Sequence, residues 1–128
     1  MNLSNRIKVI IIKGEQDLLY LYREFLSMKG YSIIFTDTTT TNILNEYKKY
    51  NPDVIIIDYD LVDAKDDVDS SKKIIDSFPE ASILMISAIV SIKQSVYKEQ
   101  FSKYKKIEFL FEPIKLQMLE KSIKILAR

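Results

Sequence analysis

The sequence predicts a doubly wound α/β fold, with five parallel strands covered by helices on both faces. Five short runs rich in Ile, Val and Phe recur along the chain, and a segment with helical periodicity follows each of them. The runs at 9–12 and 54–57 are continuously apolar, which is typical of central strands buried on both faces. A chain of 128 residues is long enough for one core and too short for two, so a single domain is expected over 1–128.

The five strands are expected at the apolar runs, with the weaker second and fifth runs at the edges of the sheet. They are Ile7–Ile12, Tyr31–Phe35, Val54–Ile57, Ile83–Ile86 and Ile107–Phe111. Because crossovers between parallel strands are right-handed, the topologies that fit include the flavodoxin-like order 2-1-3-4-5. Ligands of such sheets bind beyond the carboxyl ends of the strands, which here are followed by residues 13–17, 58–69, 87–91 and 112–113.

The first two helices are predicted from apolar residues at three- and four-residue steps. In the first helix these are Leu18, Tyr22, Phe25 and Met28. Gly30 then stands where a helix C-cap is expected. In the second helix they are Ile43, Leu44 and Tyr47. The preceding run Thr38–Thr41 is expected to cap this helix, which ends before Asn51 and its proline.

Three further helices are expected. The third begins at Ser70 or Ser71 and ends at Pro79. The fourth is diluted by Ser and β-branched residues, and its apolar positions are Ile92, Val96 and Phe101. Pro113 is expected to open the fifth, whose inward stripe is Leu116, Leu119, Ile123 and Leu126.

The residue types that the chain lacks exclude several kinds of chemistry. It contains no His and no Cys, and therefore no imidazole for a catalytic triad or zinc site, no disulfide and no thiolate ligand. Residues 1–8 lack the apolar stretch of an export signal, and no apolar run is long enough to cross a bilayer. A cytoplasmic protein is expected. With a net charge of +1 and no DNA-binding motif, direct binding of nucleic acid is disfavoured.

Four segments together resemble the receiver domains of two-component response regulators, and the resemblance covers essentially the whole chain. They are IIIKGEQDLLYLYREFL at 10–26, NPDVIIIDYDL at 51–61, MISA at 85–88 and FLFEP at 109–113. The resemblance implies a CheY-like fold and places Asp58 at the phosphoacceptor position. It also implies that Ser87 stands at the family's hydroxyl position and Phe109 at its switch-aromatic position. Pro113 corresponds to the proline of its Lys-Pro pair.

The chain departs from the family's pattern where the phosphorylation chemistry is carried out. In that chemistry a carboxylate attacks a phosphoryl group while Mg²⁺, a lysine and a hydroxyl neutralise its oxygens. Lys13 and Gly14 stand at the positions of the family's acidic pair, and Glu112 stands at the position of its lysine. These departures predict a pseudo-receiver that works without phosphorylation or a cofactor. Mg²⁺ is expected only if Asp58 is phosphorylated, with Asp58 and Glu15 as its candidate ligands.

The site still needs a positive charge if Asp58 and Glu112 are both ionised. Lys13, at the end of the first strand, is expected to supply it, with its ammonium near either or both carboxylates, roughly where Mg²⁺ would sit. Each candidate also has a purely structural interpretation. In these interpretations Asp58 accepts backbone hydrogen bonds, Ser87 caps a turn, Phe109 packs in the core and Glu15 complements the N-terminus of a helix.

Together these features predict a signalling module, not an enzyme, that acts through protein–protein contacts. Residues 93–128 carry nine basic side chains against four acidic ones. They include most of the face through which receiver domains usually communicate, formed by the fourth helix, fifth strand and fifth helix. The residues expected at this interface are Lys93, Lys115, Met118 and Ile125. The expected partners are a histidine kinase, an output protein or a second copy of the chain.

Two other functions stay open at this point. One is a phosphorylation-competent response regulator that uses Asp58, which phosphate transfer retained in Mg²⁺ would reveal. The other is a flavodoxin-like binder of a flavin or nucleotide. It is disfavoured because residues 13–16 form neither a Ser/Thr-rich phosphate loop nor part of a G-x-x-x-x-G-K-[ST] sequence.

Overall fold

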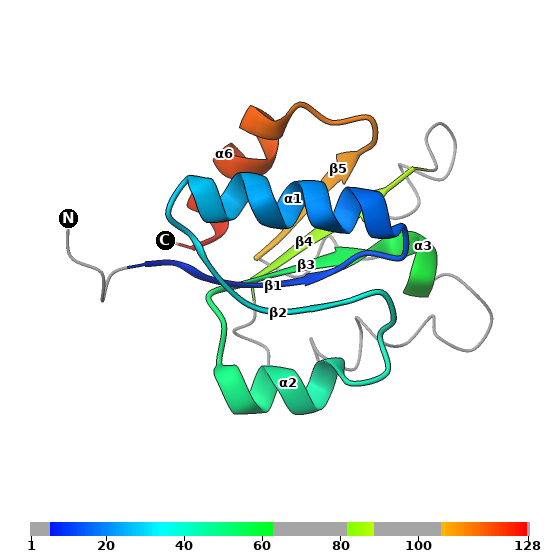
Figure 1. Cartoon of the computed structure of the whole chain (residues 1–128), viewed down its shortest axis with the longest axis vertical. Helices are drawn as coiled ribbons and strands as arrows, with labels where there is room; N and C mark the ends of the chain where they lie inside the picture. Colours follow the sequence, from blue (N-terminus) through cyan, green and yellow to red (C-terminus); the bar gives the residue numbers. More distant parts are fainter. Residues whose placement is uncertain (1–5, 63–81, 89–105, 128) are drawn as a thin grey trace.

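The computed structural model describes residues 6–62, 82–88 and 106–127, and its central feature is a five-strand sheet (Figure 1). The strands lie in the order β2-β1-β3-β4-β5, and each neighbouring pair is parallel. Their bounds are β1 Lys8–Ile12, β2 Ser32–Asp37, β3 Val54–Asp58, β4 Ile83–Ser87 and β5 Ile107–Phe111. The predicted strands, their order and the edge positions of the second and fifth strands are confirmed.

Helix α1, Gln16–Met28, follows its prediction except in the last turn. Glu15 begins the helix, because its carboxylate accepts hydrogen bonds of 3.0 and 2.9 Å from two backbone N–H groups of the first turn. Gly30 ends it, as expected, by adopting a φ of +95° that a residue with a side chain rarely takes. Met28 belongs to the apolar spacing that predicts this helix, but its side chain is 86% exposed. The residues that α1 buries are Leu19, Tyr22 and Leu26.

Helix α2, Ile43–Tyr50, lies on the opposite face of the sheet from α1 (Figure 1). The run Thr38–Thr41 precedes this helix but does not cap it as predicted. The N-cap residue is Asn42, and its side chain makes no capping hydrogen bond. The first two threonine N–H groups bind the side chain of Asp37 instead, at 2.7 and 3.3 Å, and this turns the chain as it leaves β2. The helix ends where expected, at Asn51 in the left-handed region with a φ of 46°.

Helix α3, Tyr59–Val62, is a single turn directly after β3 that the sequence pattern did not predict. The helices predicted at 70–79 and 92–101 lie outside the described residues. Helix α6, Leu116–Leu126, is the fifth predicted helix, and it buries Leu119, Ile123 and Leu126 as expected. Pro113 does not open it, because the N-cap is Lys115 and Pro113 lies earlier, after a cis peptide bond. Within the described part of the chain, no helix is both long and apolar enough to cross a membrane.

The sheet separates two apolar layers, each lined by alternate residues of the strands. The layer under α2 and α3 includes Ile10, Ile12, Ile55 and Ile57. The layer under α1 and α6 includes Val9, Ile11, Val54 and Ile56. All eight side chains are 0% exposed, which explains why the runs at 9–12 and 54–57 are apolar without alternation. The same alternation decides which layer the polar residues at the strand ends face.

Candidate functional site

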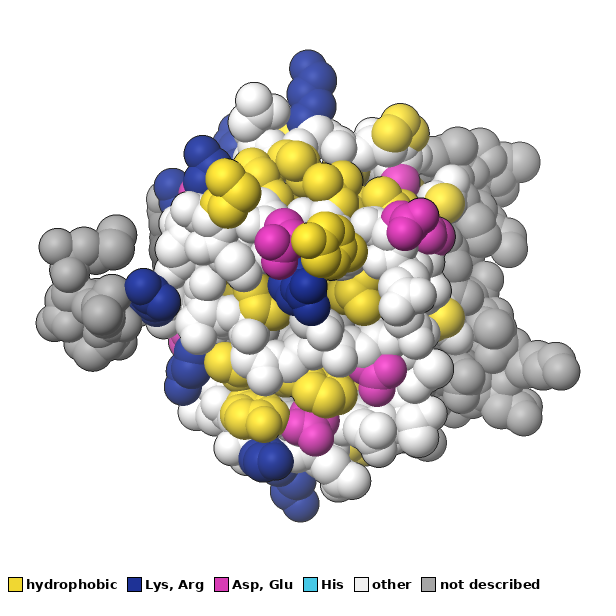
Figure 2. Space-filling model, in the orientation of Figure 1, with side chains coloured by type: hydrophobic (Ala, Val, Ile, Leu, Met, Phe, Trp, Pro, Cys, Tyr) yellow, Lys and Arg dark blue, Asp and Glu magenta, His cyan; other side chains and the backbone are white. Residues whose placement is uncertain are grey.

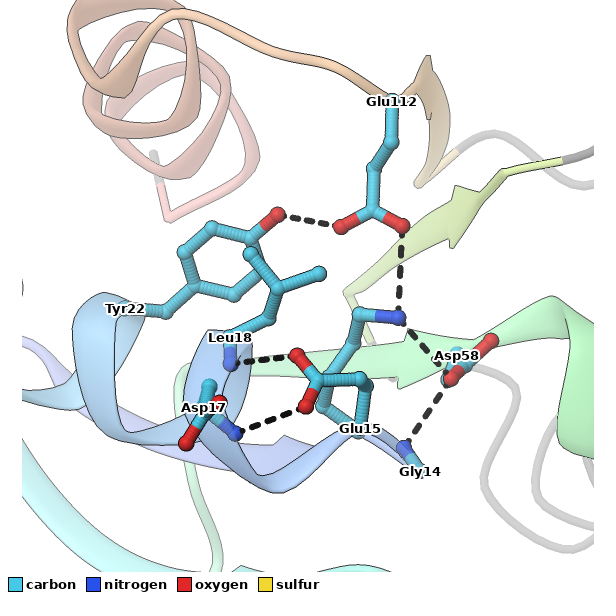
Figure 3. A network of polar contacts seen from close by, with 8 residues as sticks. Gly14, Glu15, Asp17, Leu18, Tyr22, Asp58 and Glu112 are labelled. Carbon is cyan, nitrogen blue, oxygen red and sulfur yellow. Dashed lines mark hydrogen bonds and ion pairs between the residues drawn. The ribbon is translucent and has the colours of Figure 1, made fainter.

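Lys13, Asp58 and Glu112 each stand at the carboxyl end of a strand or directly after it, and strand alternation directs them to one face. Alternate side chains of a strand lie on the same face of the sheet. The side chain two residues before each of these charged residues packs in the α1/α6 layer, and so does the side chain four residues before Lys13 and Asp58. These side chains are Val9 and Ile11 in β1, Val54 and Ile56 in β3, and Leu110 in β5. The three charged side chains continue these series and converge next to α1 (Figure 3).

The ammonium of Lys13 pairs with both carboxylates, and dashed lines in Figure 3 mark the two contacts. Lys13 Nζ is 3.1 Å from Asp58 Oδ2 and 3.2 Å from Glu112 Oε1, and the three side chains are 4%, 5% and 9% exposed. The backbone N–H of Gly14 donates a further hydrogen bond of 3.0 Å to Asp58 Oδ2. The contact predicted for Lys13 is therefore present, and it involves both carboxylates.

The electrostatics of this group keep Lys13 charged. Burial alone would lower the pKa of the Lys13 ammonium, but the charges and hydrogen bonds of Asp58 and Glu112 outweigh burial and raise it. The attraction within a buried ion pair mainly offsets the cost of removing its charges from water. Removing one partner leaves an uncompensated charge, which costs about 3–5 kcal/mol. No member of the group can leave alone without that cost.

Tyr22 belongs to this group as well, although the sequence pattern used it only as one of the apolar residues that predict α1. Its hydroxyl donates a hydrogen bond to Glu112 Oε2 (Figure 3). Burial, followed by the hydrogen bond and charge of Glu112, raises the pKa of the Tyr22 phenol, which therefore remains a donor. The available signal was the residue type, because a buried tyrosine in an apolar stripe carries a hydroxyl that usually needs a partner. The contact ties α1 to the segment between β5 and α6.

Glu15, a candidate metal ligand, is engaged elsewhere. Both of its carboxylate oxygens accept N–H bonds from the first turn of α1. Among the described residues, no three side chains of the types that bind metals are grouped to hold an ion. Mg²⁺ requires several oxygen ligands, whereas the positions of the family's acidic pair hold the ammonium of Lys13 and the bare backbone of Gly14. The described residues at this site therefore do not fit Mg²⁺.

Ser87 ends β4 and is 1% exposed. Strand β4 pairs with β3, and Ile86 lies opposite Asp58. Ser87 and Asp58 therefore lie together where the carboxyl ends of the strands meet, as expected. In the alternation of β4, Ser87 continues the series of Ile83 and Met85, which pack in the α2/α3 layer. Its carbonyl accepts a hydrogen bond of 2.8 Å from the N–H of Glu112 and so helps to hold the end of β5.

Phe109 packs on the α2/α3 side of the sheet. Its ring centroid lies 6.3 Å from that of Tyr59 and 6.3 Å from that of Phe111, with which it stacks. Pro113 is exposed directly after Glu112. The structure thus brings Lys13, Asp58 and Glu112 together on one side of the sheet and gives Phe109 a packing position on the other.

Two of the residues predicted at a partner interface are exposed apolar side chains on α6. Met118 and Ile125, seven residues apart on one side of the helix, are 43% and 45% exposed. Lys115 is exposed and forms the N-cap of α6. Lys93 lies outside the described residues.

Comparison with solved structures relates this fold to receiver domains. A CheY-like receiver domain protein from Methanospirillum hungatei JF-1 matches with a TM-score of 0.79 and 16% identity over 96% of this chain and 94% of that one. A receiver domain protein from Clostridium thermocellum has a TM-score of 0.78 and 17% identity over 94% of each chain. A chain of the CheX–CheY–BeF3–Mg²⁺ complex from Borrelia burgdorferi has a TM-score of 0.78 and 18% identity over 95% of this chain and 90% of that one. No protein family model and no curated protein matches the sequence. The chain therefore has the fold of response regulator receiver domains.

Proposed function

We propose that residues 1–128 form a receiver-like signalling module that works through protein contacts without being phosphorylated. The observation that carries the proposal is the buried position of Lys13 Nζ, 3.1 Å from Asp58 and 3.2 Å from Glu112. The receiver-domain fold supports the class of protein, and Asp58 at the end of β3 supports the location of the site. The module is a binding protein, not an enzyme.

The chemistry of phosphoryl transfer is opposed by this arrangement. An aspartate that accepts a phosphoryl group needs a carboxylate oxygen available for attack and positive charge on the incoming oxygens. The charge of Lys13 is already shared between two carboxylates, and an ammonium cannot coordinate several oxygens as Mg²⁺ does. A second carboxylate about 4 Å from an incoming negative charge repels it by about 4 kcal/mol, which slows transfer about a thousandfold. Glu112 brings such a charge to the position where the family has a lysine.

The same contacts hold the segment between β5 and α6 in one place. Glu112 is bound by Lys13 from the end of β1 and by Tyr22 from α1. Neither contact requires a modified Asp58. The module would therefore present one arrangement of β5 and α6 to its partners, and its signal would depend on which partners are present.

The test compares the natural chain with a variant in which the phosphorylation residues are restored. Both are incubated with acetyl phosphate and Mg²⁺, and the label on Asp58 is followed by intact mass and peptide mapping. The natural chain is expected to gain no label and to bind no Mg²⁺. The variant with Lys13→Asp and Glu112→Lys is expected to gain both properties, and adding Asp58→Asn to it should abolish the label.

A third replacement, Gly14→Asp, is kept in reserve because its site is crowded. A Cβ at Gly14 would stand 3.0 Å from Leu61 Cδ2, so the end of that side chain would have to shift. Labelling of the natural chain at Asp58, retained in Mg²⁺, would overturn the proposal and establish the phosphorylation-competent alternative.

The exposed side of α6 is the proposed contact surface for a partner such as a histidine kinase or an output protein. Met118 and Ile125 supply its apolar centre, and Lys115 supplies positive charge at its edge. Met118→Asp and Ile125→Asp are each expected to weaken binding at least tenfold without unfolding the chain, because both side chains are exposed. Asn45→Asp, on the exposed side of α2, is the matched control. Chemical cross-linking of the natural chain and of each variant identifies the proteins that bind. If neither α6 variant changes the set of proteins cross-linked to the chain, the contact lies elsewhere.

A further inference from the structure

One flank of α1 exposes apolar side chains that the core of this chain does not use. Leu21 and Met28, two helical turns apart, are 44% and 86% exposed. Beside them, Leu18 and Phe25 are only partly covered by the layer beneath. Figure 2 shows hydrophobic side chains gathered over α1 on its α6 side. Fully burying a large apolar side chain contributes about 1.5–3 kcal/mol, so this flank offers a docking surface.

The direction of this flank follows from helical geometry. The hydroxyl of Tyr22 reaches Glu112, which directly follows β5 in the segment that leads to α6. Going round the helix surface from Tyr22, the next positions are Leu18 and Phe25, and then Leu21 and Met28. The exposed apolar residues therefore lie on the flank of α1 that is nearest to α6 and open to solvent.

Charged residues of opposite sign accompany the two helices on this face. On α1, Asp17 and Glu24 alternate with Leu21 and Met28 in one exposed stripe. On α6, Lys121 and Lys124 form an exposed basic stripe. Local partners engage some of them weakly, since Arg23 is 3.4 Å from Glu24 and Glu120 is 3.5 Å from Lys124. The face thus combines an acidic and apolar ridge with a basic ridge.

We infer that a second copy of this chain docks on this face, with α1 of each copy against α6 of the other around a twofold axis. A twofold axis brings the same patch of both copies together, so the acidic ridge of one copy meets the basic ridge of the other. Leu21 and Met28 are then covered at the centre. A net charge of +1 opposes such association very little. The inference does not rest on the proposed function.

This contact would leave the proposed partner surface available. Glu120 accepts a hydrogen bond of 3.3 Å from the hydroxyl of Tyr31, which follows α1, and this marks the α1 side of α6. At 100° per residue, Met118 and Ile125 point well away from Glu120. One copy could therefore pair through α1 and α6 while its Met118 side binds another protein.

The size of the face sets the expected strength. Helices of 13 and 11 residues are about 20 and 17 Å long, and two such helices side by side are about 20 Å wide. A face of this size covers about 400 Å² per copy, which places the contact among weak, transient interfaces, so a dissociation constant of about 1–100 µM is expected.

Sedimentation velocity of the full chain, from about 1 µM to about 500 µM, tests the inference. The natural chain is expected to form a dimer as its concentration rises, and Met28→Asp should weaken that dimer at least tenfold. Glu24→Lys and Lys121→Glu each place like charges opposite one another and should also weaken it. Their combination restores opposite charges in both copies and should restore the dimer.

Asn45→Asp is the control, because α2 lies on the opposite face of the sheet from α1, outside the inferred contact, and this variant should leave the dimer unchanged. Circular dichroism of every variant establishes that these exposed replacements leave the fold intact. A chain that stays monomeric over the whole concentration range overturns the inference. A dimer that tolerates Met28→Asp but is lost with Met118→Asp overturns it as well and assigns self-association to the other side of α6.

Discussion

Replacing Lys13 by methionine tests whether its ammonium is the internal counter-ion of the site. Methionine keeps an unbranched side chain but removes the ammonium of Lys13 from the Asp58 and Glu112 carboxylates, which are 5% and 9% exposed. Breaking a buried ion pair in this way costs about 3–5 kcal/mol, out of a total stability of about 5–15 kcal/mol for a domain. At about 3–5 °C per kcal/mol, the thermal midpoint should fall by about 10–25 °C.

The unfolding free energy lost on replacing Lys13 by methionine should depend on pH, because the two carboxylates that remain can be protonated. Near neutral pH the two carboxylates of the variant repel each other inside the protein. At lower pH a proton can take the place of the missing ammonium, so the folded variant binds more protons than the unfolded chain does. The difference in unfolding free energy between the natural chain and the variant should therefore shrink as the pH falls from about 7 to about 4. Urea unfolding followed by circular dichroism measures it.

Two controls separate the charge from other effects of the substitution. Lys48→Met removes an exposed lysine of α2 and should change the unfolding free energy by less than about 0.5 kcal/mol. Adding Asp58→Asn and Glu112→Gln to Lys13→Met removes both carboxylate charges and should recover most of the loss. A loss below about 1 kcal/mol, or one that is the same at every pH, would refute the role of Lys13 as counter-ion.

Tyr22→Phe removes a hydrogen-bond donor from the buried Glu112 and should lower the unfolding free energy by about 1–3 kcal/mol in urea titrations, whereas the exposed Tyr20→Phe should change it little. The natural chain should lose stability above about pH 10, because the pKa values of Lys13, Tyr22 and Tyr31 are all raised and the folded state holds protons that the unfolded chain releases. The urea midpoint between about pH 9 and pH 11 measures this loss, which should be smaller in Lys13→Met. In Gly30→Ala the added Cβ meets no atom, but the residue must keep a φ of +95°. Backbone strain alone should therefore lower the unfolding free energy by about 1 kcal/mol, and an unchanged thermal midpoint would contradict this.

The strands and the meeting of Lys13 with Asp58 and Glu112 could be predicted because both depend on local regularities. Apolar runs without alternation identify strands buried on both faces. Parallel strands bring their carboxyl ends to one edge of the sheet, and a period of two decides the face on which each side chain lies. Residue type and position along the strand were therefore enough to place one ammonium near either or both of the two carboxylates.

Other features could not be predicted because residues far apart in the chain decide them. Met28 shares the apolar spacing of Leu18, Tyr22 and Phe25, but its side chain is 86% exposed. The threonines before α2 are good capping residues by type, yet Asp37 binds two of their N–H groups first.

The sequence by itself determined which charged residues stand at the strand ends and that the usual metal ligands and lysine are replaced. Only the tertiary structure decided that a single ammonium reaches both carboxylates and that Tyr22, ninety residues earlier in the chain, completes the group at Glu112. The reason is physical. Residue type and strand period are encoded locally, whereas a contact of about 3 Å depends on the register and twist of neighbouring strands and on the helix packed over them.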